Sequence, residues 1–97
     1  MMIIYLKKSN RKDKKWMAVI NNKTIHFGQD GASDFTKNKD IQRKRLYINR
    51  HKSNENWGKT GIRTAGFWSR WLLWNETTIS KSIKSIEKKF NVKINKL

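Results

Sequence analysis

The chain has 97 residues, with 23 lysines and arginines against 7 aspartates and glutamates, which gives a formal net charge of +16. This length predicts one domain spanning residues 1–97, and the absence of cysteine argues against a small disulfide-stabilised secreted scaffold. No apolar run reaches the roughly 18 residues of a membrane span, so we expect no membrane segment, no signal peptide and no secretion.

The first third of the chain predicts an antiparallel meander of three strands. Apolar, β-rich runs occupy residues 2–6, 16–20 and 24–27. Asn21 and Asn22 separate the last two runs, and asparagine tolerates positive φ, so a tight hairpin turn is favoured there. Lys7–Lys15 has seven ionisable side chains in nine residues, which predicts a solvated, mobile loop of the domain.

A glycine-containing turn leads from the meander into a predicted basic helix over Lys37–His51. Asp34 or Thr36 can cap this helix at its N-terminus. Ile41 and Ile48 are seven residues apart, and this spacing predicts that both face the core while the cations line the outside.

Two further helices are predicted after a long connection over Lys52–Thr64. Ala65–Trp74 has apolar residues all round, which is typical of a buried helix. The final helix has the clearest periodicity, at Ile79, Ile83, Ile86 and Phe90, with Thr77 or Thr78 as its N-cap, Asn91 beyond its end and a short edge strand over Val92–Ile94. The predicted class is α+β: a three-stranded antiparallel meander followed by two or three helices packed on a tryptophan-rich core.

Positive charge is densest over residues 37–52, where seven cations are opposed only by Asp40. A phosphate backbone presents repeated anions, and each phosphate neutralised by lysine or arginine releases counterions. Most solvated surfaces mix both signs, so this pattern favours polyanion binding over a merely solubilising surface. We expect nucleic acid as the partner, with DNA favoured over RNA.

The segment Gly58–Gly66, GKTGIRTAG, places two cations among three glycines before a helix. Its backbone N–H groups can cradle a phosphate, although the P-loop spacing is absent, and the alternative is a flexible turn. Trp57 lies in a polar loop and can stack on a base, whereas the crowded aromatics after it indicate a core. The predicted nucleic-acid contacts are Lys37, Lys39, Arg43, Lys44, Arg50, Lys52, Trp57, Lys59 and Arg63.

The sequence offers little catalytic chemistry. His26 and His51 are the only histidines, and no metal-ligand spacing is recognisable, so we expect no cofactor, no metal and no enzyme activity. A small metal-dependent nuclease using Asp30, Asp34 or Glu55 is an open alternative.

Three strings are distinctive: FGQDGASDFTKNKD, RLYINRHKSNENW and GIRTAGFWSRWLLWN. Together they resemble a family of small, basic, mostly uncharacterised proteins of large nucleocytoplasmic DNA viruses, over about Lys15–Ile94. The resemblance implies a viral protein in the host cytoplasm, at the viral factory, with the virion as a further location, and it implies no catalytic residues. The predicted role is sequence-independent phosphate-backbone binding, for genome packaging or condensation. The alternative is a minor capsid or core protein that binds acidic partners among other virion proteins.

Overall fold

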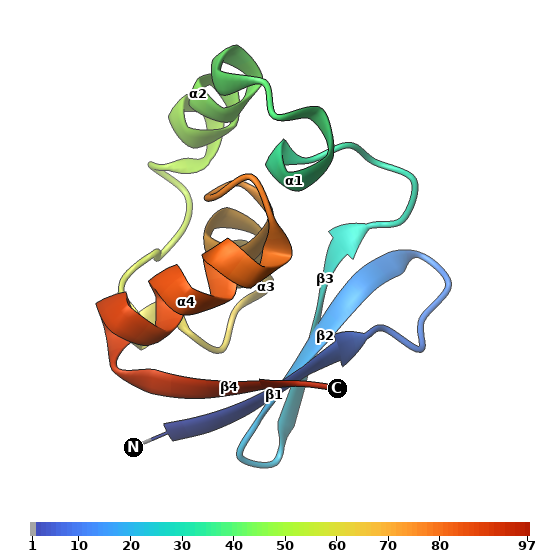
Figure 1. The fold of residues 1–97 in the computed structure, drawn as a ribbon, viewed down its shortest axis with the longest axis vertical. Coiled ribbons are helices and arrows are strands. Elements are labelled where there is room, and N and C mark those ends of the chain that lie inside the picture. Colours follow the sequence, from blue (N-terminus) through green and yellow to red (C-terminus); the bar gives the residue numbers. More distant parts are fainter. Residues whose placement is uncertain (1) are drawn as a thin grey trace.

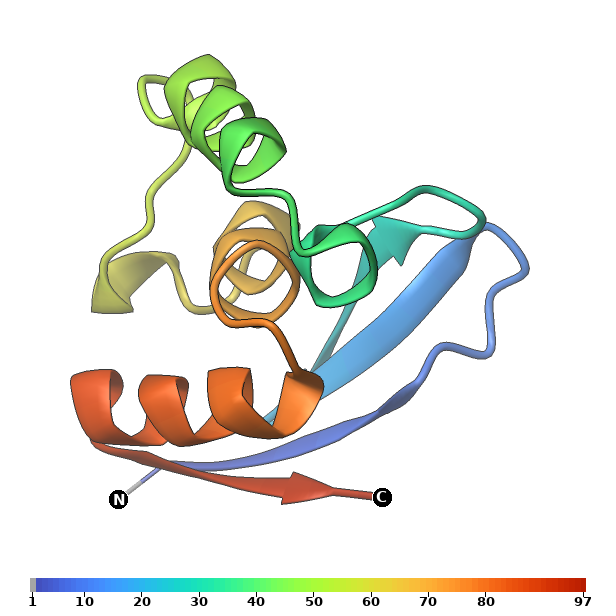
Figure 2. The ribbon, with the colours of Figure 1, turned by 45° about the horizontal axis from the view of Figure 1, so that its top comes forward.

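The computed structural model describes residues 2–97 and shows two layers, a four-stranded sheet and a set of helices on one side of it (Figures 1 and 2). The predicted α+β class is confirmed. The strands are β1 (Met2–Lys8), β2 (Lys14–Ile20), β3 (Lys23–Gln29) and β4 (Val92–Lys96). The helical elements are α1 (Phe35–Asn38), α2 (Ile41–His51), the 3₁₀ turn η1 (Lys59–Gly61), α3 (Ala65–Trp68), the π-helical turn η2 (Ser69–Leu73) and α4 (Ile79–Phe90).

The sheet order is β3-β2-β1-β4, and its first three strands form the predicted antiparallel meander. Asn21 at the β2–β3 turn has a φ of 54°, as its hairpin position requires. The predicted edge strand at the C-terminus is β4, which pairs in parallel with β1 and places Ile94 beside Ile4. The last strand of the chain therefore joins the first.

The charged loop between β1 and β2 is shorter than predicted, because the strands extend to Lys8 and begin again at Lys14. Lys15 departs from the expectation of a solvated residue. Its ammonium lies 2.7 Å from the Asp34 carboxylate, and the side chains are only 9% and 3% exposed. Because a buried charge needs a partner, this pair connects β2 to the turn before α1.

The predicted single helix over Lys37–His51 is two helices, because the chain breaks at Lys39, where φ is 52°. Asp40 then caps α2, its carboxylate accepting from the backbone N–H groups of Gln42 and Arg43. The break turns the start of α2 outward. The prediction that Ile41 faces the core is wrong, since this side chain is 52% exposed.

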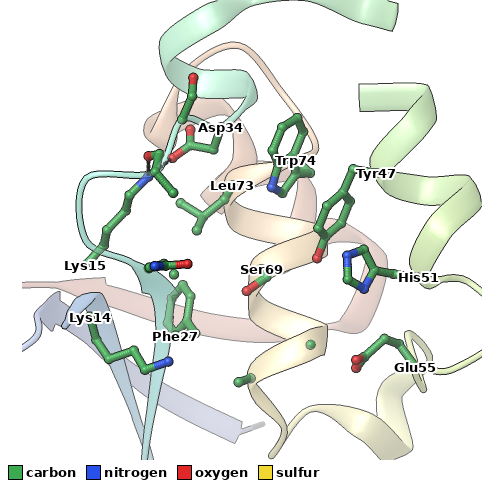
Figure 3. A pocket seen from close by; sticks show the side chains of 16 residues that line it. Lys14, Lys15, Phe27, Asp34, Tyr47, His51, Glu55, Ser69, Leu73 and Trp74 are labelled. Atoms are coloured by element: carbon green, nitrogen blue, oxygen red, sulfur yellow. Dashed lines mark hydrogen bonds and ion pairs between the residues drawn. The ribbon is translucent and has the colours of Figure 1, made fainter. Parts of the chain in front are cut away.

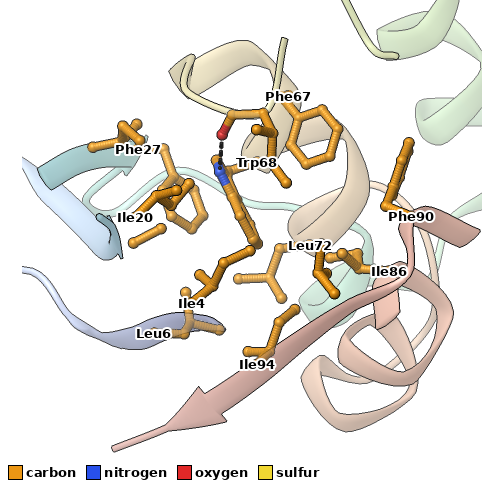
Figure 4. Packing of buried hydrophobic residues seen from close by; sticks show 14 of the residues in the cluster. Ile4, Leu6, Ile20, Phe27, Phe67, Trp68, Leu72, Ile86, Phe90 and Ile94 are labelled. Atoms are coloured by element: carbon orange, nitrogen blue, oxygen red, sulfur yellow. Dashed lines mark hydrogen bonds between the residues drawn. The ribbon is translucent and has the colours of Figure 1, made fainter. Parts of the chain in front are cut away.

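The core lies between the sheet and the segment formed by α3, η2 and α4 (Figure 4). Trp68 is fully buried at its centre, and its indole N–H donates to the Ile62 carbonyl at 2.7 Å. The Phe67 ring contacts the Phe90 ring, with centroids 4.9 Å apart. The tryptophan-rich core is thus confirmed, with Trp68 as its fully buried tryptophan. Among residues 2–97, no helix is long and apolar enough to cross a bilayer.

Candidate nucleic-acid interface

Helix α2 stands apart from the body of the molecule (Figures 1 and 2). None of its eleven residues, all within the described part of the chain, is buried. Its half-buried residues are Lys44, Tyr47, Ile48 and His51, which recur at the three- and four-residue spacing of one helix face. The rest of its surface is exposed, which is unusual for a helix with several apolar residues and leaves a broad face for a partner.

A few side chains on the inward face anchor α2. The Tyr47 ring stacks on Trp74 with centroids 4.8 Å apart and lies 4.5 Å from the His51 ring. The Lys44 ammonium donates to the Asn75 carbonyl at 2.6 Å and lies over the Phe35 ring. These contacts set the direction in which the opposite face of α2 points.

Lys44 therefore differs from its predicted role as a phosphate contact, because its cation turns toward the protein. Burial lowers the pKa of Lys44, and the nearby Arg70 guanidinium lowers it further against the opposing effect of Glu76. Tertiary contacts decided this orientation. The neighbouring cations of the same basic run point elsewhere.

Arg43 and Arg50 are brought together on an exposed flank of α2, two helical turns apart. They line a small groove of about 120 Å³ with Leu46, Tyr47 and Trp74. Two predicted phosphate contacts thus share one groove, and the aromatic pair that anchors the helix also lines it.

The other predicted cations are also exposed. Lys39 and Lys52 flank α2 directly, Lys39 at the end of α1 and Lys52 after the last residue of α2. Lys37 lies in the last turn of α1. Lys59 and Arg63 are exposed in the connection between α2 and α3. The exposed predicted cations therefore lie on α2, beside it and in the segment that follows it.

The glycine-flanked segment is a packed turn. The N–H groups of Gly58, Gly61, Ile62 and Thr64 already donate within the segment 56–64. A Cβ at Gly61 would lie 2.0 Å from the Asn56 carbonyl oxygen, so glycine is needed there for close backbone approach. This arrangement favours the turn over the phosphate cradle.

Trp57 is half-buried and belongs to the support of α2. Its ring is nearly parallel to the Tyr47 ring, at 6.4 Å between centroids, and the Arg70 guanidinium lies 5.5 Å from it. Its carbonyl accepts from the Trp71 indole N–H at 2.9 Å. The predicted role of Trp57 as an exposed stacking platform is therefore not favoured by its surroundings.

A cleft of about 320 Å³ lies on the inward side of α2, between this helix and the strands β2 and β3 (Figure 3). Lys14 and Lys15 line one side, Tyr47, His51 and Glu55 line the other, and Ser69 lies between them. The three distinctive strings lie within residues 27–75, and each contributes residues to this cleft. Sequence reasoning missed Tyr47 and Ser69 as members of one site, because 22 residues separate them along the chain.

Tyr47 remains a neutral phenol in this cleft. Burial raises the pKa of Tyr47 to about 12, and the Glu55 carboxylate acts in the same direction, while Arg70 and the Ser69 hydroxyl act against it. The hydroxyl is thus available as a hydrogen-bond donor across the physiological range.

The acids proposed for a metal-dependent nuclease do not form a ligand set. Among residues 2–97, no group of three histidine, cysteine, aspartate or glutamate side chains is placed to hold a metal ion. The Asp34 carboxylate already binds the Lys15 ammonium and the backbone N–H of Thr36. The Asp34 carboxylate is therefore already engaged by groups of the chain itself.

These features define a small, strongly basic α+β protein with an outlying cationic helix. Residues 4–51, from β1 to the end of α2, match the model of a protein family whose function is unknown (DUF5754). No curated protein and no solved structure matches the chain.

Proposed function

We propose that this protein binds nucleic acid by neutralising backbone phosphates with lysine and arginine. One observation supports this above all: of the 23 basic residues, only Arg11 and Lys15 lie within 4.0 Å of a carboxylate in the chain from residue 2 to 97. Unpaired like charges repel one another and disfavour the compact state. A polyanion relieves that repulsion.

The contacts proposed for this role lie on and beside α2. Arg43 and Arg50 share one flank of the helix, and Lys39 and Lys52 are exposed at its two ends. Asp40 is the only acidic residue at this helix, and its carboxylate caps the helix by accepting from the Gln42 backbone N–H. A polyanion approaching α2 therefore meets positive charge with no repelling carboxylate on the outward face. The proposal is of a binding protein, without catalysis.

The test is the affinity of the protein for labelled DNA and RNA, measured by fluorescence anisotropy across a salt series. We expect Arg43→Ala with Arg50→Ala to weaken binding to unrelated sequences alike and to reduce the slope of log affinity against log salt by about 1.8, because each lost phosphate contact removes about 0.9. The matched control is Lys81→Ala with Lys84→Ala, which removes the same charge from exposed positions on α4.

Two results would count against the proposal. Equal losses of affinity in the α2 and α4 variants would show that α2 is not the binding element and that binding depends only on the net charge. Failure of the unmodified protein to bind either heparin or nucleic acid at moderate salt would refute phosphate binding altogether.

A further inference from the structure

We propose that α2 enters the major groove of double-stranded DNA and that Gln42, Arg45 and Asn49 contact base edges there. This inference rests on the proposed function. It specifies double-stranded DNA as the nucleic acid and a preference for particular base sequences. The basic residues alone had predicted sequence-independent binding.

The geometry of α2 supplies the first argument. Lys44, Tyr47 and His51 mark its inward face. With 3.6 residues per turn, Gln42 and Asn49 lie on the opposite side, seven residues apart and thus nearly in line along the helix axis. Both are exposed, and Arg45 is exposed on the same side.

The chemistry of these side chains supplies the second argument. A glutamine or asparagine amide can both donate to and accept from adenine in the major groove, and arginine can donate twice to guanine. Leu46 lies beside Gln42 and Asn49, is 59% exposed, and offers apolar contact of the kind that thymine methyl groups accept. Phosphate neutralisation requires cations only, so two amides and an exposed leucine in the middle of this face need another explanation.

The shape and surroundings of α2 supply the third argument. Eleven residues give a helix about 16 Å long, and a major groove about 12 Å wide admits a helix. Arg43 and Arg50 lie on the flank of the outward face, where a helix seated in a groove meets the phosphates. The outward face presents no acid, so its charge complements the duplex. In contrast, the major groove of double-stranded RNA is too deep and narrow for side chains to read.

The first stage of the experiment selects duplexes bound by the full-length protein from a random-sequence DNA pool and then sequences them. Anisotropy compares the enriched duplex with a scrambled duplex of the same composition, the corresponding RNA duplex and the single strand. We expect the enriched DNA duplex to bind most tightly and the RNA duplex and single strand to bind no better than the scrambled DNA.

The second stage uses two double variants that keep the net charge and one that lowers it by two. Gln42→Ala with Asn49→Ala should lower the affinity for the enriched duplex about 10-fold or more, while affinity for the scrambled duplex stays unchanged. Asn10→Ala with Asn54→Ala removes two exposed amides elsewhere and should change neither affinity. Arg43→Ala with Arg50→Ala should weaken binding to both duplexes by similar factors, and circular dichroism verifies that each variant folds.

Three results would overturn the inference while leaving phosphate binding intact. They are the absence of any enriched sequence, equal binding of RNA and DNA duplexes, and an unchanged preference in the Gln42 and Asn49 variant. Absence of binding to every nucleic acid would instead refute the proposed function on which the inference rests.

Discussion

The Tyr47 ring lies almost parallel to the Trp74 indole, with centroids 4.8 Å apart and planes inclined by 7°. This stack joins α2 to the residue that follows η2. Beside it, the Lys44 ammonium donates to the carbonyl of the next residue, Asn75. Because α2 has no buried residue of its own, these contacts largely determine how firmly its cationic face is presented.

Replacing Tyr47 tests how much its stack on Trp74 holds α2 in place. We expect Tyr47→Ala to lower the free energy of unfolding by about 2 kcal/mol, because a half-buried aromatic ring and its stack are lost. Amide hydrogen exchange should become faster in α2 than in the sheet. Tyr47→Phe keeps the stack and serves as the control, with exchange in α2 close to that of the unmodified protein. Equal exchange rates in α2 for both variants would show that the helix is held by other contacts.

The ionisation of Tyr47 gives a pH prediction. Its pKa is raised from 10.0 to about 12, so between these values the folded state holds a proton that the unfolded chain has released. The stability linked to this group is therefore fully present below pH 10 and is lost as the pH rises through 12.

Ultraviolet absorbance measures the ionisation of the Tyr47 phenol directly. The difference titration between the unmodified protein and Tyr47→Phe should show a phenolate appearing near pH 12 while the protein is folded. Urea unfolding at several alkaline pH values should show a steeper loss of stability in the unmodified protein than in the variant. A difference titration centred near pH 10 would contradict the burial of this hydroxyl.

Two glycines of one segment should respond differently to alanine. At Gly61 the added Cβ would meet the Asn56 backbone carbonyl at 2.0 Å, and backbone cannot move without disturbing the turn. At Gly66 the nearest atom is a carboxylate oxygen of Glu55, the flexible end of a side chain that can rotate away.

We therefore expect Gly61→Ala to cost about 2–3 kcal/mol of stability and Gly66→Ala less than about 1 kcal/mol. Urea denaturation measures both. Glu55→Ala combined with Gly66→Ala removes the clash and should be no less stable than Glu55→Ala alone. Similar stability costs at the two glycines would contradict the distinction between the fixed backbone at Gly61 and the movable Glu55 side chain at Gly66.

The Lys15–Asp34 ion pair should contribute far more than the exposed pair in the same region. Lys15→Met leaves the Asp34 carboxylate buried without its cation, and such a loss costs about 3–5 kcal/mol. Arg11→Met breaks the Arg11–Asp13 pair, whose side chains are 54% and 65% exposed, and should cost less than about 1 kcal/mol. Chemical denaturation of the two variants makes the comparison, and equal costs would indicate that Lys15 is solvated in solution.

The sequence by itself determined those features that depend on neighbours along the chain. Alternating or continuous apolar runs predicted the meander, and the spacing from Ile79 to Phe90 predicted α4. Thr78 caps that helix and Asn91 follows it with a φ of 55°, because capping depends on a side chain and a backbone only a few residues apart. The tryptophan-rich core followed from the crowding of aromatics in a chain otherwise dense in charge.

The tertiary structure alone decided which cations face outward and which residues share a cleft. Lys44 and Arg43 are adjacent in the same basic run, yet one donates to Asn75 and the other is exposed. The parallel pairing of β4 with β1 and the meeting of Tyr47 with Ser69 join segments far apart in sequence. Local periodicity carries no information about such contacts, because they depend on how complete elements pack against one another.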